Sequence, residues 1–215
     1  PHLTGVAADK DKIDGFLGAI KAMGITTVLA LRGDRPAGFT GTDAELFSTF
    51  PHASDLVAYI HDHHPQLAIG VAGFPEAHAE APSFATDLAV MRRKVECGAD
   101  FIITQLYFDN RVYFDYVERL RAQGVAVPVV PGILPIRSLA SLRFVLEMCN
   151  ARVPGRLINS LMKAHEQGGA SAVYEIGVAH ARAQIKELLD GGAPGVHLYT
   201  LNKADMCLAV MDDLL

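Results

Sequence analysis

Short apolar runs alternate with longer amphipathic segments along the whole chain. Six of these runs end at glycine, proline or polar residues, a pattern typical of strands that are buried on both faces. They cover residues 2–8, 26–31, 68–75, 101–108, 128–135 and 195–202. Apolar positions at helical spacing predict helices over residues 9–23, 53–64, 83–97, 110–123, 139–149, 154–166, 170–189 and 203–215.

The alternation predicts an α/β fold made of consecutive βα units. No hairpin signal and no shift in composition interrupts it, so we expect residues 1–215 to form a single domain. Units of this kind form either an open sheet or a barrel, and a common barrel needs eight of them. Because the sequence supplies six, we expect a (β/α)8 TIM barrel whose first two units lie upstream of Pro1. An open flavodoxin-like sheet is the alternative.

An unclosed barrel would expose two unpaired strand edges. A protein that began at Pro1 would therefore be expected to aggregate.

Composition narrows the class of partner. Half of the 215 residues are hydrophobic and the net charge is −5, which argues against the basic surface that nucleic acids require. The three cysteines, Cys97, Cys149 and Cys207, are far apart and odd in number, so we expect reduced thiols and a cytoplasmic location. No apolar run approaches the roughly 20 residues of a membrane span, and no signal peptide is visible. A small-molecule partner is expected.

Polar groups gather where the predicted strands end. The clearest case is the run from Leu31 to Asp34, where Arg32 and Gly33 follow a buried strand. In parallel α/β folds this end of the strands is where ligands bind. An ion pair without function, or an exposed integrin-binding loop, are the alternative interpretations of Arg-Gly-Asp. Other strand ends contribute Phe74, Glu76, His78, Gln105, Tyr107, Leu134, Pro135, Asn202 and Lys203.

Three further groups are ambiguous on sequence alone. The Gln105 amide lies between apolar residues and would be costly to bury without a partner. Segment 76–80 has no second cluster at metal-ligand spacing, so we expect a solvated loop or a contact with an organic ligand there, and no metal. Segment 61–64 is also metal-like in composition, but it lies in the last turn of a predicted helix, where the helix dipole favours cations. Residues 92–94 are either a solvated helix face or a ligand contact, and no glycine-rich phosphate motif is present.

The strand-end residues, taken in order, resemble the methylenetetrahydrofolate reductase family of flavoenzymes, in its bacterial-type catalytic domain. Seven segments in register across the chain support the resemblance. They are residues 1–4, 30–34, 74–78, 93–95 with 98–99, 103–105, 131–135 and 199–202. The resemblance implies a (β/α)8 barrel that binds FAD at the carboxyl ends of its strands.

The resemblance also implies a reaction and its binding residues. NAD(P)H would reduce FAD and leave, and the flavin would then reduce 5,10-methylenetetrahydrofolate to 5-methyltetrahydrofolate, which feeds methionine synthesis. NADH and NADPH are not distinguished, and a homo-oligomer is expected. The implied FAD contacts are His2, Leu31, Arg32, Gly33, Asp34, Ala53, Phe74, His78, Ala81, Asp87, Arg93 and Lys94.

Three residues carry the implied chemistry. Asp34 would make the reduced flavin a readier hydride donor and stabilise the cationic folate iminium. Gln105 would hydrogen-bond the pterin in one half-reaction and the nicotinamide in the other. Lys203 stands near the folate tail, where the family often has arginine, so it keeps the charge but loses bidentate recognition.

The sequence also departs from the family pattern. Phe74 replaces a frequent tyrosine, and His52 and Val90 replace aromatic and polar residues expected beside the cofactor. The family's general-acid glutamate and a threonine and tyrosine stretch belong to its first two strands, upstream of Pro1. A relative that binds flavin or folate without turnover is therefore an alternative. A flavin-free barrel lyase is another, although Lys203 is the only lysine at a predicted strand end to act as its nucleophile.

Overall fold

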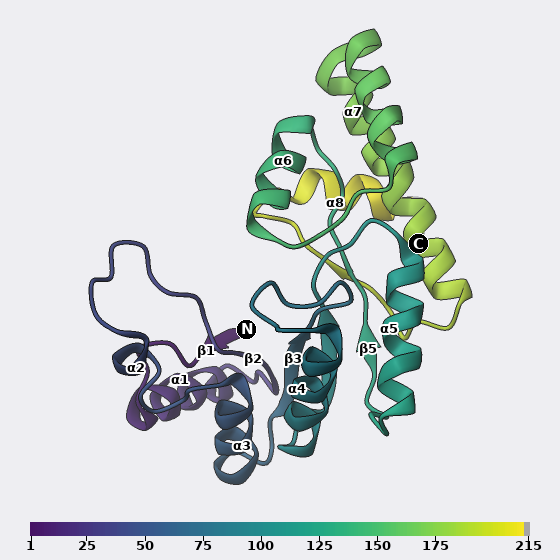
Figure 1. Ribbon diagram of the computed structural model, residues 1–215. Helices are drawn as coiled ribbons and strands as arrows, with labels where there is room; N and C mark the ends of the chain where they lie inside the picture. The colour runs from purple at the N-terminus through teal and green to yellow at the C-terminus, as the bar shows by residue number, and fades with distance from the viewer. Residues whose placement is uncertain (213–215) are drawn as a thin grey trace. The chain divides into compact units, whose positions relative to one another are not determined.

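The computed structural model describes residues 1–212, with strands and helices in the expected alternation (Figure 1). The strands are β1 (His2–Thr4), β2 (Thr27–Leu31), β3 (Ala68–Gly73), β4 (Phe101–Thr104), β5 (Val129–Val130), β6 (Gly132–Ile133) and β7 (His197–Leu198). The helices are α1 (Lys10–Ala22), α2 (Asp43–Leu46), α3 (Ala53–His63), α4 (Phe84–Glu96), α5 (Asn110–Ala122), α6 (Leu139–Met148), α7 (Gly155–Asp190) and α8 (Ala204–Met211). The last three residues of the helix predicted over 203–215 lie outside the described residues.

The chain forms two compact units. Unit 1 comprises Pro1–Gly73, Leu88–Ile102 and Gln123–Pro128. Unit 2 comprises Phe74–Asp87, Ile103–Ala122 and Val129–Leu215. Each unit therefore draws on segments that are distant in sequence.

Unit 1 contains a parallel sheet. In β1 and β2, His2 lies opposite Leu29, and β2 pairs with β3 in the same direction, with Val28 opposite Ile69. The backbone N–H of Asp100 donates to the Ile69 carbonyl at 2.8 Å, which brings the start of β4 beside β3. Within unit 1, β1, β2 and β3 thus lie side by side in chain order. Parallel strands joined by helices confirm the expected α/β class and its six βα units.

Helix α1 shows how the local sequence sets the element bounds. The Asp9 side chain accepts a hydrogen bond from the Lys12 backbone at 2.8 Å, as an N-cap should. Ile13, Leu17 and Ile20 recur at helical spacing and are buried. Gly24 then adopts φ +75°, a conformation that ends the helix at low cost for glycine.

A polar network joins α1 to α3 in unit 1. The Asp14 carboxylate accepts hydrogen bonds from the Tyr59 hydroxyl at 2.9 Å and from His64 Nε2 at 2.8 Å. His64 is buried, and its Nδ1 lies 3.4 Å from Lys21 Nζ. The hydrogen bond from His64, followed by that from Tyr59, lowers the pKa of Asp14 below its ordinary 3.8.

This network predicts a pH dependence of stability. The pKa of Asp14 is lower in the folded than in the unfolded protein. The ionised carboxylate therefore contributes fully to stability above the unfolded-state pKa, and this contribution is lost as the pH falls through the folded-state pKa. In the wild type, the free energy of unfolding should fall as the pH is lowered below about 5, and part of that fall comes from protonation of Asp14. In Asp14→Asn this part should be missing, so the fall should be shallower. Denaturant unfolding at a series of pH values measures the difference. Asp11→Asn, on the same helix but outside these hydrogen bonds, is the control. Parallel pH profiles for the wild type and Asp14→Asn would refute the assignment.

Unit 2 has its own core and a second parallel pair, β6 with β7, in which Gly132 lies opposite His197. The run predicted as one strand over 128–135 forms β5 and β6, which are separated by Pro131. Proline lacks an N–H, and only its carbonyl pairs here, accepting from His197 at 2.8 Å. A cluster of buried apolar residues packs nearby: Leu106, Phe108, Leu134, Ile136, Leu142, Val145, Leu157, Leu161 and Val173.

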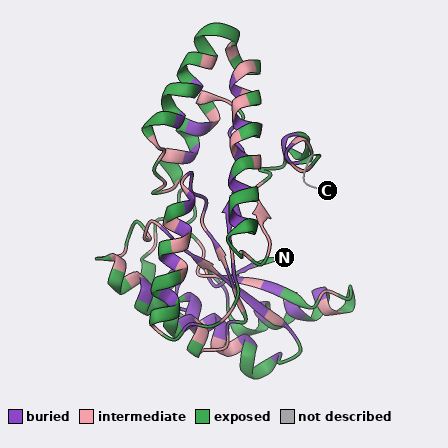
Figure 2. Cartoon of the chain, turned by 90° about the vertical axis from the view of Figure 1, so that its right-hand side faces the viewer, coloured by how far each residue is buried: buried purple, intermediate pink, exposed green. Residues whose placement is uncertain are grey.

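The helices of unit 2 follow the predicted pattern. Ser138 caps α6 through its hydroxyl, which accepts from Ser141 N at 3.1 Å. The two helices predicted over 154–166 and 170–189 are confirmed as the two arms of α7, which meet at a kink where Gly169 has non-helical φ 63° and ψ −147° (Figure 1). The arm before Gly169 is mostly exposed, whereas the arm after it buries one face (Figure 2).

Other differences concern short elements. Strands β1, β4 and β7 are shorter than predicted, because the apolar runs continue into turns that leave the sheet. Helix α2 was not predicted, although Thr42 and Glu45 form a capping box at its start. Within residues 1–212, none of the helices combines the length and the apolarity that crossing a bilayer would require.

Candidate functional site

The end of β2 in unit 1 is a tight turn. Gly33 has φ +87°, and a Cβ at this position would lie 2.5 Å from Val6 Cγ1. Only glycine therefore fits between the strand and its neighbouring loop. Arg32 places its guanidinium 4.9 Å from the centre of the Phe47 ring, and the carboxylate of Asp34 is exposed. The turn thus presents one cation and one anion directly after a buried strand.

The loop that follows Asp34 is held by Arg35. Its guanidinium donates to Asp43 Oδ1 at 2.6 Å, to the Gly41 carbonyl at 2.6 Å and to the Phe39 carbonyl at 3.3 Å. These hydrogen bonds close residues 35–43 into a compact loop, which follows β2 in the sequence. Apart from its glycine and threonine content, the segment carries no sequence pattern that predicts this arrangement.

The remaining predicted residues of unit 1 differ in exposure. His2 is exposed on β1, and Ala53 is buried as the first residue of α3. On α4, Arg93 is exposed, whereas Lys94 is only 9% exposed and donates from Nζ to the Ala72 carbonyl at 3.0 Å. Lys94 is therefore not part of a solvated helix face.

In unit 2, four predicted residues surround the loop after β3. The Phe74 and His78 rings lie 4.6 Å apart and perpendicular to each other. The His78 backbone N–H donates to Asp87 Oδ2 at 3.3 Å, and its carbonyl accepts from Ala81 N at 2.9 Å. Ala77, between them, has φ 66°, which turns the loop sharply. The structure thus brings Phe74, His78, Ala81 and Asp87 together.

Glu76, one of the predicted strand-end residues, lies in the same loop. Burial raises the pKa of its carboxyl group, and Glu76 Oε2 accepts from the Arg152 backbone N–H at 3.1 Å. This contact ties the loop after β3 to the segment that precedes α7 within unit 2.

Gln105 follows β4, and its amide has a partner. Its side-chain Oε1 accepts from the backbone N–H of the next residue, Leu106, at 2.9 Å. Burial of the Gln105 amide oxygen is therefore compensated by a hydrogen bond. The side chain is half-buried at the carboxyl end of the strand.

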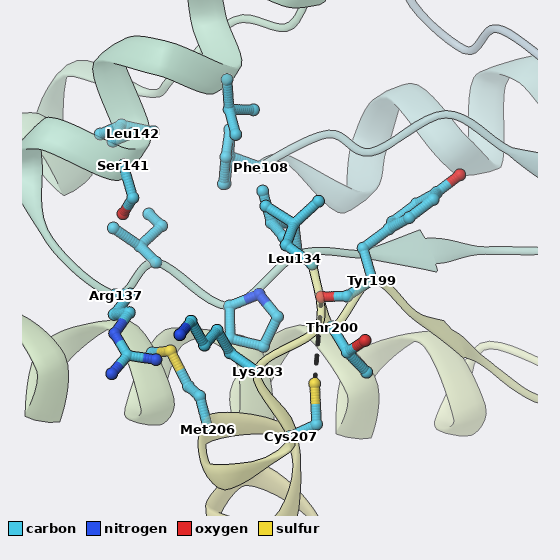
Figure 3. Close-up of a pocket in the computed structure, with 14 residues that line it drawn as sticks. Phe108, Leu134, Arg137, Ser141, Leu142, Tyr199, Thr200, Lys203, Met206 and Cys207 are labelled. Atoms are coloured by element: carbon cyan, nitrogen blue, oxygen red, sulfur yellow. Dashed lines mark hydrogen bonds between the residues drawn. The ribbon is translucent and has the colours of Figure 1, made fainter.

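A cavity of about 160 Å³ lies at the carboxyl ends of β6 and β7 in unit 2 (Figure 3). Its walls are largely apolar, and Lys203 is one of its few polar residues. The full lining comprises Phe108, Leu134, Pro135, Ile136, Arg137, Ser141, Leu142, Val145, Tyr199, Thr200, Leu201, Lys203, Met206 and Cys207. The cavity thus lies at the end of the strands where parallel α/β folds usually bind ligands.

A hydrogen-bonded layer fixes the strands beneath the cavity. The Tyr199 hydroxyl donates to the Thr104 carbonyl at 2.9 Å, and the Thr104 hydroxyl accepts from Gly132 N at 2.9 Å. A Cβ on Gly132 would lie 2.2 Å from the Thr104 carbonyl oxygen, so glycine is required. Burial raises the pKa of Tyr199 to about 12, which keeps its hydroxyl protonated and able to donate.

The predicted site residues are thus grouped unit by unit. Leu31, Arg32, Gly33 and Asp34 lie together at the end of β2 in unit 1. In unit 2, Phe74, His78 and Ala81 lie in the loop after β3, and the backbone of His78 contacts Asp87 at the start of α4. Their convergence on a common site with Gln105 stays a prediction, because these groups belong to different units. Sequence reasoning missed Arg137 and Cys207 of the cavity, and their only signal was proximity to the predicted strand ends.

No metal site is present among residues 1–212, in which no group of three or more histidine, cysteine or carboxylate side chains could hold an ion. The histidine-rich segment 61–64 instead makes local contacts. His63 Nδ1 lies 2.9 Å from the Tyr59 carbonyl, and His61 Nδ1 lies 3.2 Å from Asp62 Oδ1.

Comparison with known proteins identifies the relatives of this chain. The family model described as methylenetetrahydrofolate reductase matches residues 1–215. The 5,10-methylenetetrahydrofolate reductase of Salmonella typhimurium is 33% identical over 214 residues, which cover all of this chain and 69% of that protein. Methylenetetrahydrofolate reductase (NADH) 1 of Zea mays is 34% identical, covering 99% of this chain and 37% of that protein.

A probable methylenetetrahydrofolate reductase (NADPH) of Caenorhabditis elegans is 32% identical, covering 99% of this chain and 32% of that protein. The chain thus spans about a third of the length of these eukaryotic relatives.

A solved structure has the same fold. An uncharacterized protein from Clostridium thermocellum, described as binding two copies of 5-methyl-5,6,7,8-tetrahydrofolic acid, superimposes with a TM-score of 0.58. It is 16% identical, and the match covers 99% of this chain and 93% of that one. The match of the family model over the entire chain, supported by relatives at 32–34% identity, shows that this chain belongs to the methylenetetrahydrofolate reductase family.

Proposed function

We propose that the chain is the flavin-binding part of an FAD-dependent oxidoreductase that reduces 5,10-methylenetetrahydrofolate to 5-methyltetrahydrofolate with NAD(P)H. The observation that carries the proposal is the full-length family match, with relatives named for this reaction at about one third identity. The product would feed methionine synthesis. The relatives include both NADH- and NADPH-named enzymes, so the choice of nicotinamide nucleotide stays open.

The donor set of the chain fits FAD chemically. The cofactor combines an anionic diphosphate with two aromatic ring systems. Arg32 and Arg93 would supply cations for the diphosphate, and the perpendicular rings of Phe74 and His78 would supply aromatic surface. Lys94, which is buried with its Nζ on the Ala72 carbonyl, would add positive charge. His2, Leu31, Gly33, Asp34, Ala53, Ala81 and Asp87 are the other residues that we propose would hold it. When bound, the flavin supplies the hydride chemistry of both half-reactions, in a ping-pong sequence.

Asp34 is the residue that we propose tunes this chemistry. It is exposed at the end of β2, where its carboxylate is available to a ligand. A negative charge beside the cofactor would favour hydride donation and stabilise the cationic iminium of the folate substrate. The Gly33 turn sets the direction in which the chain leaves β2, so Gly33 positions Asp34.

Gln105 and Lys203 are proposed to bind substrate. The Gln105 amide lies at a strand carboxyl end, and an amide can both donate to and accept from a pterin edge or a carboxamide. Lys203 lines the cavity at the ends of β6 and β7 and offers an ammonium group to the carboxylates of the folate tail.

The proposal also covers location and assembly. The three cysteines are free thiols, as expected for a reducing compartment, and we propose a cytoplasmic enzyme that acts as a homo-oligomer.

Purified protein tests the function directly. We expect the protein to bind one FAD per chain. NADH or NADPH should bleach the absorbance of the bound flavin under anaerobic conditions, and methylenetetrahydrofolate should restore the oxidised spectrum. A colourless protein that does not bind added FAD would favour the flavin-free lyase. Reduction of the flavin without formation of 5-methyltetrahydrofolate would favour a non-catalytic relative.

A further inference from the structure

The cavity of unit 2 carries two cations among its lining residues, Arg137 and Lys203 (Figure 3). The lining residues include no aspartate or glutamate. An apolar chamber with cationic groups suits a ligand that has an apolar body and an anionic end.

The size of the cavity limits that body. Cavities of roughly 150 Å³ with apolar walls accommodate a single benzene ring, and this cavity measures about 160 Å³. It is therefore large enough to hold one aromatic ring. Phe108, Leu142 and Met206 offer such a ring apolar contacts.

The guanidinium of Arg137 has more N–H donors than its ion pair uses, so it can also bind the anionic end of a ligand. Its Nη1 lies 3.2 Å from Asp205 Oδ1, and the two side chains are 46% and 56% exposed. A guanidinium has five N–H donors, so one ion pair with Asp205 leaves several available. The contact with the first turn of α8 holds Arg137 near the end of the cavity where that helix begins.

We propose that Arg137 is a specificity-determining residue that binds the glutamyl carboxylates of the folate tail, together with Lys203. The proposal rests on the proposed function and deepens it. Lys203 supplies a point charge but no fork for bidentate recognition, and Arg137 supplies that fork from the loop after β6. The benzoyl ring between pterin and glutamate would occupy the apolar chamber.

Calorimetric titration with 5-methyltetrahydrofolate tests this proposal without turnover. Arg137→Gln is expected to raise the Kd roughly tenfold, since charge-assisted hydrogen bonds are lost at a half-exposed site. Arg137→Lys should restore only part of the affinity, because charge without the fork is retained. The Kd of a tetrahydropterin without the benzoylglutamate tail should be the same in all three proteins. Arg143→Gln, an exposed arginine on α6 that does not line the cavity, is the matched control.

Each outcome decides the proposal. An unchanged Kd for 5-methyltetrahydrofolate in Arg137→Gln overturns it, and so does an equal loss for the tail-less pterin, which would indicate a general structural role.

Titration with p-aminobenzoylglutamate separates this proposal from the reductase function. If the wild type binds this fragment through Arg137 but does not reduce methylenetetrahydrofolate, the reductase function fails and the tail site stands. If the wild type is an active reductase but Arg137→Gln binds both ligands normally, only the tail site fails. Absence of binding of either ligand to the wild type overturns both.

Discussion

Asp34→Asn is expected to slow the oxidation of the reduced protein by methylenetetrahydrofolate by roughly 10²–10³-fold, the usual loss when one preorganised charge is removed from a transition state. The carboxylate would stabilise the cationic iminium that develops on the folate. Asparagine keeps the shape and removes the charge. FAD binding and reduction by NAD(P)H should change far less, because they do not create that cation. Anaerobic stopped-flow absorbance of the two half-reactions measures both effects in one preparation.

Two comparisons make this result specific. Asp43→Asn removes another exposed carboxylate of the same loop, the ion-pair partner of Arg35, so it reports loop disturbance alone. If Asp34→Asn and the wild type oxidise at equal rates, or if Asp43→Asn loses as much as Asp34→Asn, Asp34 does not have the proposed role.

Of the variants proposed, Gly177→Ala is expected to lower the free energy of unfolding most, by about 3 kcal/mol. A Cβ on this residue would lie 1.8 Å from the carbonyl oxygen of Ile136, which is backbone and cannot turn aside. The gain of roughly 1 kcal/mol in helix propensity is too small to offset that overlap. Because Ile136 also lines the cavity, the displaced chain should weaken binding of 5-methyltetrahydrofolate as well.

Gly155→Ala on the same helix is the matched control for this prediction. A Cβ there meets nothing within 4 Å, so the substitution should leave stability unchanged or raise it by up to about 1 kcal/mol. Denaturant unfolding of the wild type and both variants measures these differences. A Gly177→Ala protein as stable as Gly155→Ala would mean that α7 does not pack against Ile136 this closely.

The sequence was sufficient for the long elements because each carries its own signal. In α1, the Asp9 cap, the three buried positions and Gly24 all act within a few residues of the helix. The same holds for the core of β2, where the apolar run is unbroken. Patterns of this local kind do not depend on the rest of the fold.

Elements that depend on tertiary contacts were harder to predict. The strand expected over 128–135 is split at Pro131, and its end pairs only with β7, more than sixty residues away in sequence. Helix α2 had a local signal, the capping box at Thr42, but is too short for a periodic pattern.

The candidate site shows the same division. Leu31 to Asp34 could be found because a polar run directly follows a buried strand. The burial of Lys94 could not be read from its neighbours, since residues 92–94 are uniformly basic and only packing distinguishes them. Arg137 was missed because its partner, Asp205, and the cavity are formed by segments about seventy residues apart.

The most direct measurement of the central claim is a single anaerobic titration of the purified protein with FAD, NAD(P)H and methylenetetrahydrofolate, followed by absorbance and product analysis. We predict one bound flavin per chain, full bleaching by the nicotinamide nucleotide, and recovery of the oxidised spectrum with one 5-methyltetrahydrofolate formed per flavin. A protein that binds no flavin, or one whose reduced flavin is not oxidised by the folate, would contradict the account.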